Sequence, residues 1–322
     1  MGVNILTLSK EYNTQAKCLK LLEQIRWGKV VICPYCSSNE TSRVKRVKNR
    51  HSCKTCKRSF SCFVGTIFEG TRLPLPQWFM IIGSMLNAKS GMAAKELERN
   101  YGQTYKTVYY AAMRVRVGML MPETQLHGLL EMDESYFGGK KKRKNMLDKQ
   151  DNRASLARVD LKRGRGTSKV SVAGIVERQG NVQTKVIEKL SKRNLLAMLK
   201  SKVKKDDSIL FTDGFKSYAK VNEYIEHLVI NHSKQFSKGI THVNTIEGVW
   251  SYIKNGIKGS YKSISPKYLP FYLVQFEWAY NHRNYKGDEF KAYLKNALSQ
   301  EKELSYWKAP SKEAVKEITY QS

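Results

Sequence analysis

The amino-acid sequence predicts an α/β fold in which a mixed sheet with flanking helices follows a cysteine-rich module and a small helical region. Three observations predict it. Cysteines occur in two close pairs within residues 29–66, three helical patterns follow in residues 67–126, and strand and helix patterns alternate in residues 127–290. Such an alternation favours a sheet that is covered by helices.

The chain begins with a helical pattern. In residues 1–28, Leu19, Leu22 and Ile25 recur at helical spacing with charged residues between them. Because apolar residues three or four positions apart line one face of a helix, this segment is predicted to form one short amphipathic helix.

Residues 67–126 carry three further helical patterns. They cover residues 77–88, a segment that ends at Arg99, and residues 104–120, with glycine-containing turns between them. Three short helices joined by tight turns indicate a helix-turn-helix DNA-binding region. The last helix carries the basic side chains that we expect to contact DNA, which are Lys106, Arg114 and Arg116.

Residues 127–290 are predicted to form the α/β domain because short apolar runs alternate with helical patterns. A strand, a loop, a hairpin, a helix, a strand and further helices follow one another, and this order suits a ribonuclease-H-like core. Residues 291–322 are predicted to be a peripheral helical tail. Strands are expected at residues 129–137, 170–177, 182–187, 208–212 and 227–230, and helices at residues 192–204, 244–257 and 266–281.

The segment 140–169 is rich in Lys, Arg, Gly, Asn and Asp and has hardly any apolar periodicity. It is therefore predicted to be a long mobile loop. Because it follows the first strand of the sheet, we expect it to clamp DNA, although a solvated insertion without a partner is the alternative. Its candidate DNA contacts are Lys140, Lys141, Lys142, Arg143, Arg163 and Arg165.

The net charge points to the partner. The chain has 57 Lys and Arg against 28 Asp and Glu, which gives a formal charge of +29. An excess of this size indicates a polyanion, and double-stranded DNA is the expected one. The sequence has no apolar run long enough to span a membrane and no signal-peptide pattern, so we expect a cytoplasmic, nucleoid-associated protein without a membrane partner.

Four cysteines form two CxxC pairs, Cys33 with Cys36 and Cys53 with Cys56, and sixteen residues separate the pairs. This spacing predicts a closed, structural Zn²⁺ site of the zinc-ribbon type, with a redox pair or plain buried thiols as the alternative. The basic residues between the pairs would lie on a small β-hairpin and face phosphates. These residues are Arg43, Lys45, Arg46, Lys48 and Arg50.

Three acidic residues stand at positions where a sheet brings functional groups together. Asp133 lies inside an apolar strand, where a charge is costly unless something compensates it. Asp213 ends another strand, and strand ends are where α/β sheets place their sites. Glu247 lies near the start of a helix. Three clustered carboxylates would suit two Mg²⁺ ions, or Mn²⁺, about 4 Å apart for phosphodiester cleavage.

Each of these acids has an alternative interpretation. Spacing alone does not distinguish Asp133 from Glu131, two residues away on the same strand face, or from the adjacent Glu134. Asp213 precedes a glycine and would also suit a turn. Glu247 follows Asn244 by three residues, which matches a capping box at the start of a helix.

Eight motifs taken together are specific enough to indicate a protein family. They are CPYC, CKTC, MDESYFGGKKK, KRGRGTSK, VSVAGIVERQG, FTDGFKSY, NHSKQF and HVNTIEGVWSYIKNGIKGSY. With these motifs the chain resembles the bacterial insertion-sequence DDE transposases that carry an N-terminal zinc ribbon and are related to Merlin-type elements. The resemblance implies a ribonuclease-H-like catalytic domain in which Asp133, Asp213 and Glu247 bind the two metal ions, and it selects Asp133 over Glu131.

The resemblance also implies a further functional residue, DNA partners and the steps of the reaction. Lys254 is a fourth signature residue that would hold a phosphate of the terminal DNA, with a solvated helix-face charge as the alternative. Binding to terminal inverted repeats, assembly of a homo-oligomer on the DNA and strand transfer into target DNA are expected. The alternatives are a zinc-ribbon and helix-turn-helix DNA-binding regulator with an inactive nuclease core, and a two-metal nuclease without strand transfer.

Overall fold

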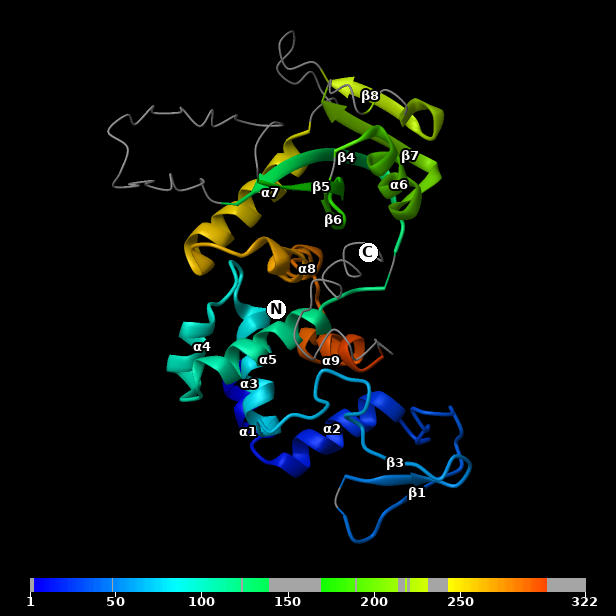
Figure 1. Ribbon diagram of the computed structural model, residues 1–322, viewed down its shortest axis with the longest axis vertical. Helices are drawn as coiled ribbons and strands as arrows, with labels where there is room; N and C mark the ends of the chain where they lie inside the picture. The colour runs from blue at the N-terminus through cyan, green and yellow to red at the C-terminus, as the bar shows by residue number, and fades with distance from the viewer. Residues whose placement is uncertain are drawn as a thin grey trace, which may run out of the picture.

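The structure is a computed structural model, and it describes residues 3–47, 49–122, 124–138, 169–188, 190–213, 218, 221–230 and 243–299. The molecule is elongated, with the large sheet at one end, the cysteine-rich module at the other and most helices between them (Figure 1). Lys48, the tail beyond residue 299 and all six candidate contacts of the basic loop lie outside the described residues.

The cysteine-rich module is a small antiparallel sheet. Strands β1 (Thr41–Arg43), β2 (His51–Cys53) and β3 (Ser59–Phe60) lie side by side in that order. Arg43 pairs with His51, so β1 and β2 form the predicted hairpin. Phe60 is fully buried and packs against the rings of His51 and Trp27, which ties the module to the preceding helix.

The N-terminal segment forms two helices, so the prediction of one helix is wrong. Helix α1 (Ile5–Glu11) ends at Tyr12, and helix α2 (Gln15–Trp27) begins after Thr14. The physical reason is local. Thr14 has an extended backbone, and its hydroxyl oxygen accepts a hydrogen bond from the backbone N–H of Lys17 at 3.3 Å, which starts a new helix there.

The three helices predicted for the middle region are present. They are α3 (Leu75–Asn87), α4 (Ala94–Tyr101) and α5 (Tyr105–Gly118). Gly102 ends α4 in the left-handed conformation that favours glycine, and Thr104 caps α5 by accepting from the backbone N–H of Thr107. The turns that the sequence predicted are therefore formed by the residues that favour them.

Helix α9 (Glu289–Ser299) belongs to the helical core, which corrects the prediction of a peripheral tail for this part of the chain. It contacts α2, α3 and α5. Tyr293 and Leu294 are fully buried, and the Tyr293 hydroxyl donates to the backbone carbonyl of Val115 at 3.1 Å. The reason is an apolar face at helical spacing, which is formed by Phe290, Tyr293, Leu294 and Ala297.

The large sheet has the order β6-β5-β4-β7-β8. Its strands are β4 (Leu126–Phe137), β5 (Val170–Glu177), β6 (Val182–Ile187), β7 (Val203–Asp213) and β8 (Glu226–Ile230). The first three pair antiparallel, whereas β7 runs parallel to both β4 and β8. In chain order this is the sequence 3-2-1-4-5, so the predicted ribonuclease-H-like α/β fold is confirmed.

Helices cover both faces of this sheet. Helix α6 (Lys192–Lys202) packs on one face with Leu130 and Met132 of β4. Helices α7 (Asn244–Gly256) and α8 (Leu269–Asn281) pack on the other. Successive residues of a strand alternate between the two faces of a sheet. Because Leu130 and Met132 face α6, Glu131 and Asp133 face α7. Among the described residues, no helix has the length and apolar character needed to cross a membrane.

Candidate functional site

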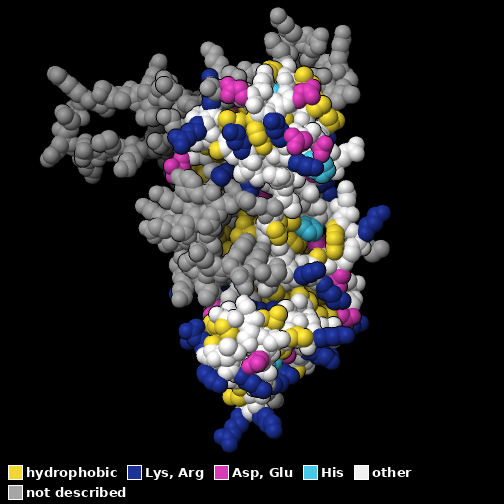
Figure 2. Space-filling model, turned by 90° about the vertical axis from the view of Figure 1, so that its right-hand side faces the viewer, with side chains coloured by type: hydrophobic (Ala, Val, Ile, Leu, Met, Phe, Trp, Pro, Cys, Tyr) yellow, Lys and Arg dark blue, Asp and Glu magenta, His cyan; other side chains and the backbone are white. Residues whose placement is uncertain are grey.

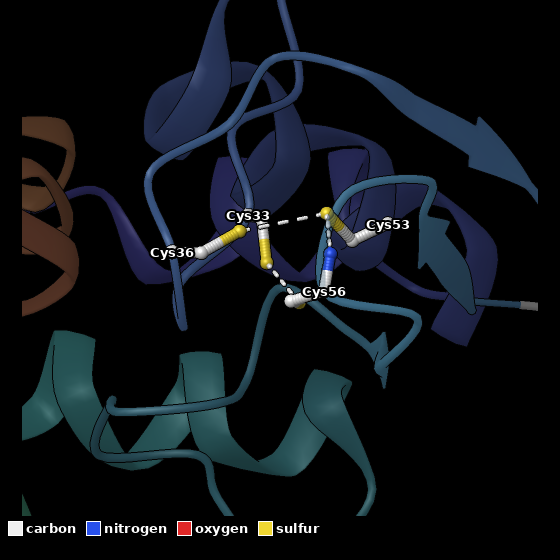
Figure 3. A group of neighbouring side chains, drawn as sticks. All are labelled: Cys33, Cys36, Cys53 and Cys56. Carbon is white, nitrogen blue, oxygen red and sulfur yellow. Dashed lines mark hydrogen bonds between the residues drawn. The ribbon is translucent and has the colours of Figure 1, made fainter.

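The four cysteines of the CxxC pairs converge, as Figure 3 shows. All four sulfur atoms lie within 4.8 Å of one another, and the Cys33–Cys56 and Cys36–Cys53 Sγ distances are both 3.6 Å. A tetrahedron of thiolates about 2.3 Å from a zinc ion has edges of about 3.8 Å, so the arrangement fits. A disulfide would need about 2.0 Å, and all four cysteines are free.

Backbone geometry favours metal binding at both knuckles. Ser37 and Lys57, each directly after the second cysteine of its pair, have positive φ angles of 58° and 59°. The tight turns leave backbone N–H groups pointing at sulfur. The N–H of Cys56 donates to Cys53 Sγ at 3.5 Å, and this hydrogen bond is the largest of the causes that lower the pKa of the Cys53 thiol. Zinc binds the thiolate form, so this turn prepares a ligand.

The predicted basic face of the module is exposed where the structure describes it. Figure 2 shows Lys and Arg side chains gathered over the end of the molecule that the module forms. Arg43 makes an ion pair with Glu23 at 3.3 Å, and Arg50 donates to Ser59 at 3.3 Å. The exposed residues of this face, together with the exposed lysine of α5, are Arg43, Lys45, Arg46, Arg50 and Lys106.

The two arginines of α5 are buried, so the expectation that they contact DNA is wrong. Arg114 donates to the backbone carbonyls of Ile67 and Glu69 at 3.0 and 2.8 Å. Arg116 is 2% exposed and donates to Gln275 Oε1 at 2.8 Å. A buried guanidinium needs such acceptors, and these bonds hold α5 to the segment that follows the zinc module and to α8.

The register of the sheet aligns two of the three predicted carboxylates. Strands β4 and β7 are parallel neighbours, and Glu131 pairs with Phe211, an offset of 80 residues. The same offset aligns Asp133 with Asp213, two positions beyond the last paired residues and at the end of β7. Neighbouring strands lie about 4.8 Å apart, so the two side chains are close.

Negative charge gathers around Asp133. The side chain is half-buried, and the indole Nε1 of Trp250 donates to its Oδ2 at 3.1 Å. Burial raises the pKa of the Asp133 carboxyl, and the charges of Asp213 and Glu247 raise it further, while the hydrogen bonds from Glu134 N–H and Trp250 oppose the shift. The three acids therefore share one region of the molecule.

Glu247 lies in the first turn of α7, exposed on the helix. Its capping-box interpretation is wrong, because Val243 is the N-cap residue, Asn244 is already helical, and no side chain of the capping position bonds the helix. Among the described residues, the four cysteines are the group whose ligand atoms all meet within 4.8 Å. The three carboxylates do not all approach so closely, and the exposed Glu247 has the room to turn.

Glu131, which lies on β4, caps the N-terminus of α7. It is fully buried, and its carboxylate accepts from Thr245 Oγ1 and from the backbone N–H of Ile246, each at 3.0 Å. Arg178 Nε donates to it at 2.7 Å. A carboxylate at a helix N-terminus is favourable both as an acceptor and for the helix dipole. Glu131 thereby fixes the turn of α7 that carries Glu247.

These contacts distinguish the three acids of the first strand. Glu131 is engaged by α7 and Arg178, as described above. Glu134 is nearly buried and faces the opposite side of the sheet, where it contributes, after burial, to raising the pKa of Tyr218. Asp133 is the one whose surroundings include Asp213 and Glu247. The role of Glu131 in holding α7 was not predicted from the sequence. The signal was an acidic residue two positions from Asp133 in an apolar strand, because a charge there requires a hydrogen-bonding or charged partner.

Lys254 lies two helical turns beyond Glu247 on α7. Burial lowers the pKa of its ammonium group, the nearby Asp133 opposes this shift, and Lys169 adds to it. The lysine is therefore close to the carboxylate region as well as to a second lysine from the start of β5.

A zinc ribbon joined to a ribonuclease-H-like domain with clustered carboxylates points to the class of enzymes that act on nucleic acids. Comparisons with known proteins narrow that class. Residues 125–281 match the ISXO2-like transposase domain, and residues 13–59 match the transposase zinc-ribbon domain.

Relatives agree with these domains. An uncharacterised protein in transposable element ISH50 of Halobacterium salinarum is 26% identical over 317 residues, which cover 96% of this chain and 97% of the relative. An uncharacterised transposase-like protein of Haemophilus influenzae is 33% identical over 108 residues, 33% of this chain and 85% of the relative. The chain belongs to the family of insertion-sequence DDE transposases with an N-terminal zinc ribbon.

Proposed function

We propose that this transposase binds the terminal inverted repeats of its element, cleaves DNA strands there and transfers them to target DNA, with two divalent metal ions bound by Asp133, Asp213 and Glu247. The observation that carries the proposal is that three acids from three elements share one region of the molecule. The β4–β7 register aligns Asp133 with Asp213, and α7 adds Glu247 over the same face of the sheet.

The donor set fits magnesium. Carboxylate oxygens are the hard ligands that Mg²⁺ and Mn²⁺ prefer. The raised pKa of Asp133 also fits, because clustered carboxylates repel one another and a bound cation relieves that repulsion. When bound, such ions supply Lewis acidity for the attacking and leaving oxygens of a phosphodiester.

The protein's own side chains orient this site. Trp250 fixes one oxygen of Asp133, and Glu131 anchors the first turn of α7 below Glu247. Lys254, within electrostatic reach of Asp133, would hold a phosphate of the terminal DNA next to the reacting bond. These contacts hold Asp133 and the first turn of α7 in place before DNA arrives, as positioned catalytic groups require.

The exposed basic residues of the zinc module and Lys106 would hold the flanking duplex, since a chain with a net charge of +29 attracts phosphates. Two or more copies of the protein would assemble with both element ends, because each end needs its own cut and both must reach one target. Such a protein would associate with the nucleoid.

The test is cleavage and joining of a duplex that carries the element's own end and flanking DNA, with Mg²⁺. We expect cut and joined products from the natural protein and none from Asp213→Asn. Asp206→Asn, an exposed acid on the same strand, is the matched control and should stay active. Binding of the ends without cutting under Mg²⁺ or Mn²⁺ would favour a DNA-binding regulator, and cutting without joining would favour a simple nuclease.

A further inference from the structure

A cavity of about 450 Å³ opens at the end of β4, beside α7. Four lysines from separate positions line it, and among its described lining residues none is acidic. Buried apolar side chains, including Phe137 and Leu269, line it as well. The lysines, all exposed, are Lys169, Lys254, Lys258 and Lys262. The cavity thus combines an apolar lining with a dense positive charge.

The cavity adjoins the carboxylate region. The ring of Phe137 contacts Trp250 edge-on with centroids 6.0 Å apart, and Trp250 donates to Asp133. Phe137 is four residues beyond Asp133 on β4, a distance of about 13 Å along a strand. Lys254 lines the cavity and is also within electrostatic reach of Asp133. A DNA strand bound at the carboxylates would therefore pass its next nucleotides along this opening.

An irregular turn presents two of the lysines. After α7 the chain continues as a π-helical turn, Ile257–Tyr261, and Lys262 then has a positive φ of 63°. Both features are unfavourable locally and are frequent at functional sites. Tyr261 anchors the turn, because its hydroxyl donates to Gln275 Oε1 at 3.0 Å and accepts from Met92 N–H at 3.1 Å. The turn is thus held on one side and directs Lys258 and Lys262 to the cavity.

We infer that this cavity receives one unpaired nucleotide of the DNA end, next to the bond that is cut; the inference rests on the function proposed above. A paired duplex offers a protein phosphates on its outside and keeps its bases stacked within. A nucleotide outside the stack offers a flat apolar base together with phosphates, which matches an apolar lining with four lysines. A volume of a few hundred cubic ångströms suits a ligand of that size.

The inference is tested with the full chain and duplexes that carry 2-aminopurine, a base that fluoresces when unstacked, at each position around the cleavage site in turn. Asp213→Asn supplies a protein that does not cut. We expect a several-fold rise in fluorescence at one position. The rise should be lost in a Lys258→Gln, Lys262→Asn variant, in which Asn tolerates the positive φ. Lys192→Gln with Lys205→Asn removes the same charge near the opposite face of the sheet and should keep it.

A second measurement separates base extrusion from general phosphate affinity. In the catalytically intact protein, the cavity variant should cut about tenfold more slowly, because it loses phosphate contacts that offset the cost of extruding a base. A mismatch at the identified position lowers that cost and should restore much of the rate, whereas weakened phosphate binding would not respond to a mismatch.

The outcomes are distinct. If no position brightens although the natural protein cuts the same DNA, the nucleotide inference fails and the transposase proposal stands. A rise that persists in the cavity variant would place the unpaired nucleotide elsewhere and also overturn the inference. If the natural protein neither binds nor cuts the ends, the proposed function fails, and the inference fails with it.

Discussion

The zinc module and the carboxylate region gather ligands for cations in opposite ways. The four cysteines come from two tight turns of one small module, and their sulfur atoms already lie at distances that suit a metal ion. The three carboxylates come from β4, β7 and α7 and do not all approach so closely. The first site is formed by local turns. The second depends on how a helix packs on a sheet, so its geometry is controlled by residues that bind no metal.

The largest effect is expected from breaking the local site. Cys53→Ser removes one of four thiolates, and a structural zinc site contributes roughly 10 kcal/mol or more to the folding of its module. We expect loss of bound zinc, measured by elemental analysis, together with loss of tight binding to the element's ends.

The comparison predicts that this damage stays local. The sheet domain has its own hydrophobic clusters on both faces, so its unfolding transition should persist in the Cys53→Ser protein. Cys18→Ser is the control, because Cys18 is buried but lies outside the metal cluster, and Ser retains a donor for the carbonyl of Tyr12. Full zinc content in Cys53→Ser would contradict the four-cysteine site.

The same contrast explains which features of the fold and the sites could be predicted from the sequence alone. The cysteine spacing and the period-two strand patterns are local, and they predicted the zinc ribbon and the strands of the sheet. Whether Arg114 and Arg116 are buried or exposed depends on residues that are far from them in the sequence. Nothing near them in the chain distinguishes an arginine that bonds the carbonyl of Ile67, or Gln275 on a distant helix, from one that faces DNA.

The choice among the acids of β4 also depends on contacts that the local sequence does not reveal. The resemblance to DDE transposases named Asp133, Asp213 and Glu247, but the reason that Glu131 is excluded is tertiary. Its carboxylate is used by Arg178 and by the first turn of α7, which lies more than a hundred residues away in the chain. Of the four cavity lysines, Lys254 was predicted, whereas Lys169, Lys258 and Lys262 were missed because the start of β5 and the turn after α7 meet only in the folded protein.

The next effect in size tests whether α7 is held by Glu131. Glu131→Gln removes the charge of a fully buried carboxylate that Arg178 and the first turn of α7 bind, and breaking such a buried pair costs about 3 to 5 kcal/mol. We expect this loss of unfolding free energy in urea. Where the protein remains folded, the Mg²⁺ concentration required for cleavage should rise about 10-fold or more, as for other residues that orient a metal ligand.

A double variant distinguishes positioning from stability. Glu131→Gln with Arg178→Met removes both charges of the pair and should recover part of the unfolding free energy. The raised Mg²⁺ requirement should remain, because α7 still lacks its carboxylate cap. If Mg²⁺ dependence returns to normal together with stability, Glu131 contributes only to folding, and the contrast between a local and a packing-dependent site is weaker than described.

The smallest effect concerns the charge that the carboxylate region holds before a metal binds. Burial and the charges of Asp213 and Glu247 raise the pKa of Asp133 above its value of 3.8 in an unfolded chain. Between these two pKa values the folded protein binds more protons than the unfolded chain, so stability falls as pH rises through that interval and stays lower above it. Asp133→Asn should therefore stabilise the protein at pH 7 in magnesium-free buffer with zinc retained.

Because Asp133 is partly exposed, solvent screening limits this gain to on the order of 1 kcal/mol. Urea unfolding with and without Mg²⁺ measures it. Added Mg²⁺ should stabilise the natural protein, since a ligand that binds only the folded state shifts the equilibrium, and should have little effect on Asp133→Asn. Asp206→Asn should behave as the natural protein does. An Asp133→Asn protein that is less stable than the natural one without Mg²⁺, or equally stabilised by it, would mean that the carboxylates do not form a shared cation site.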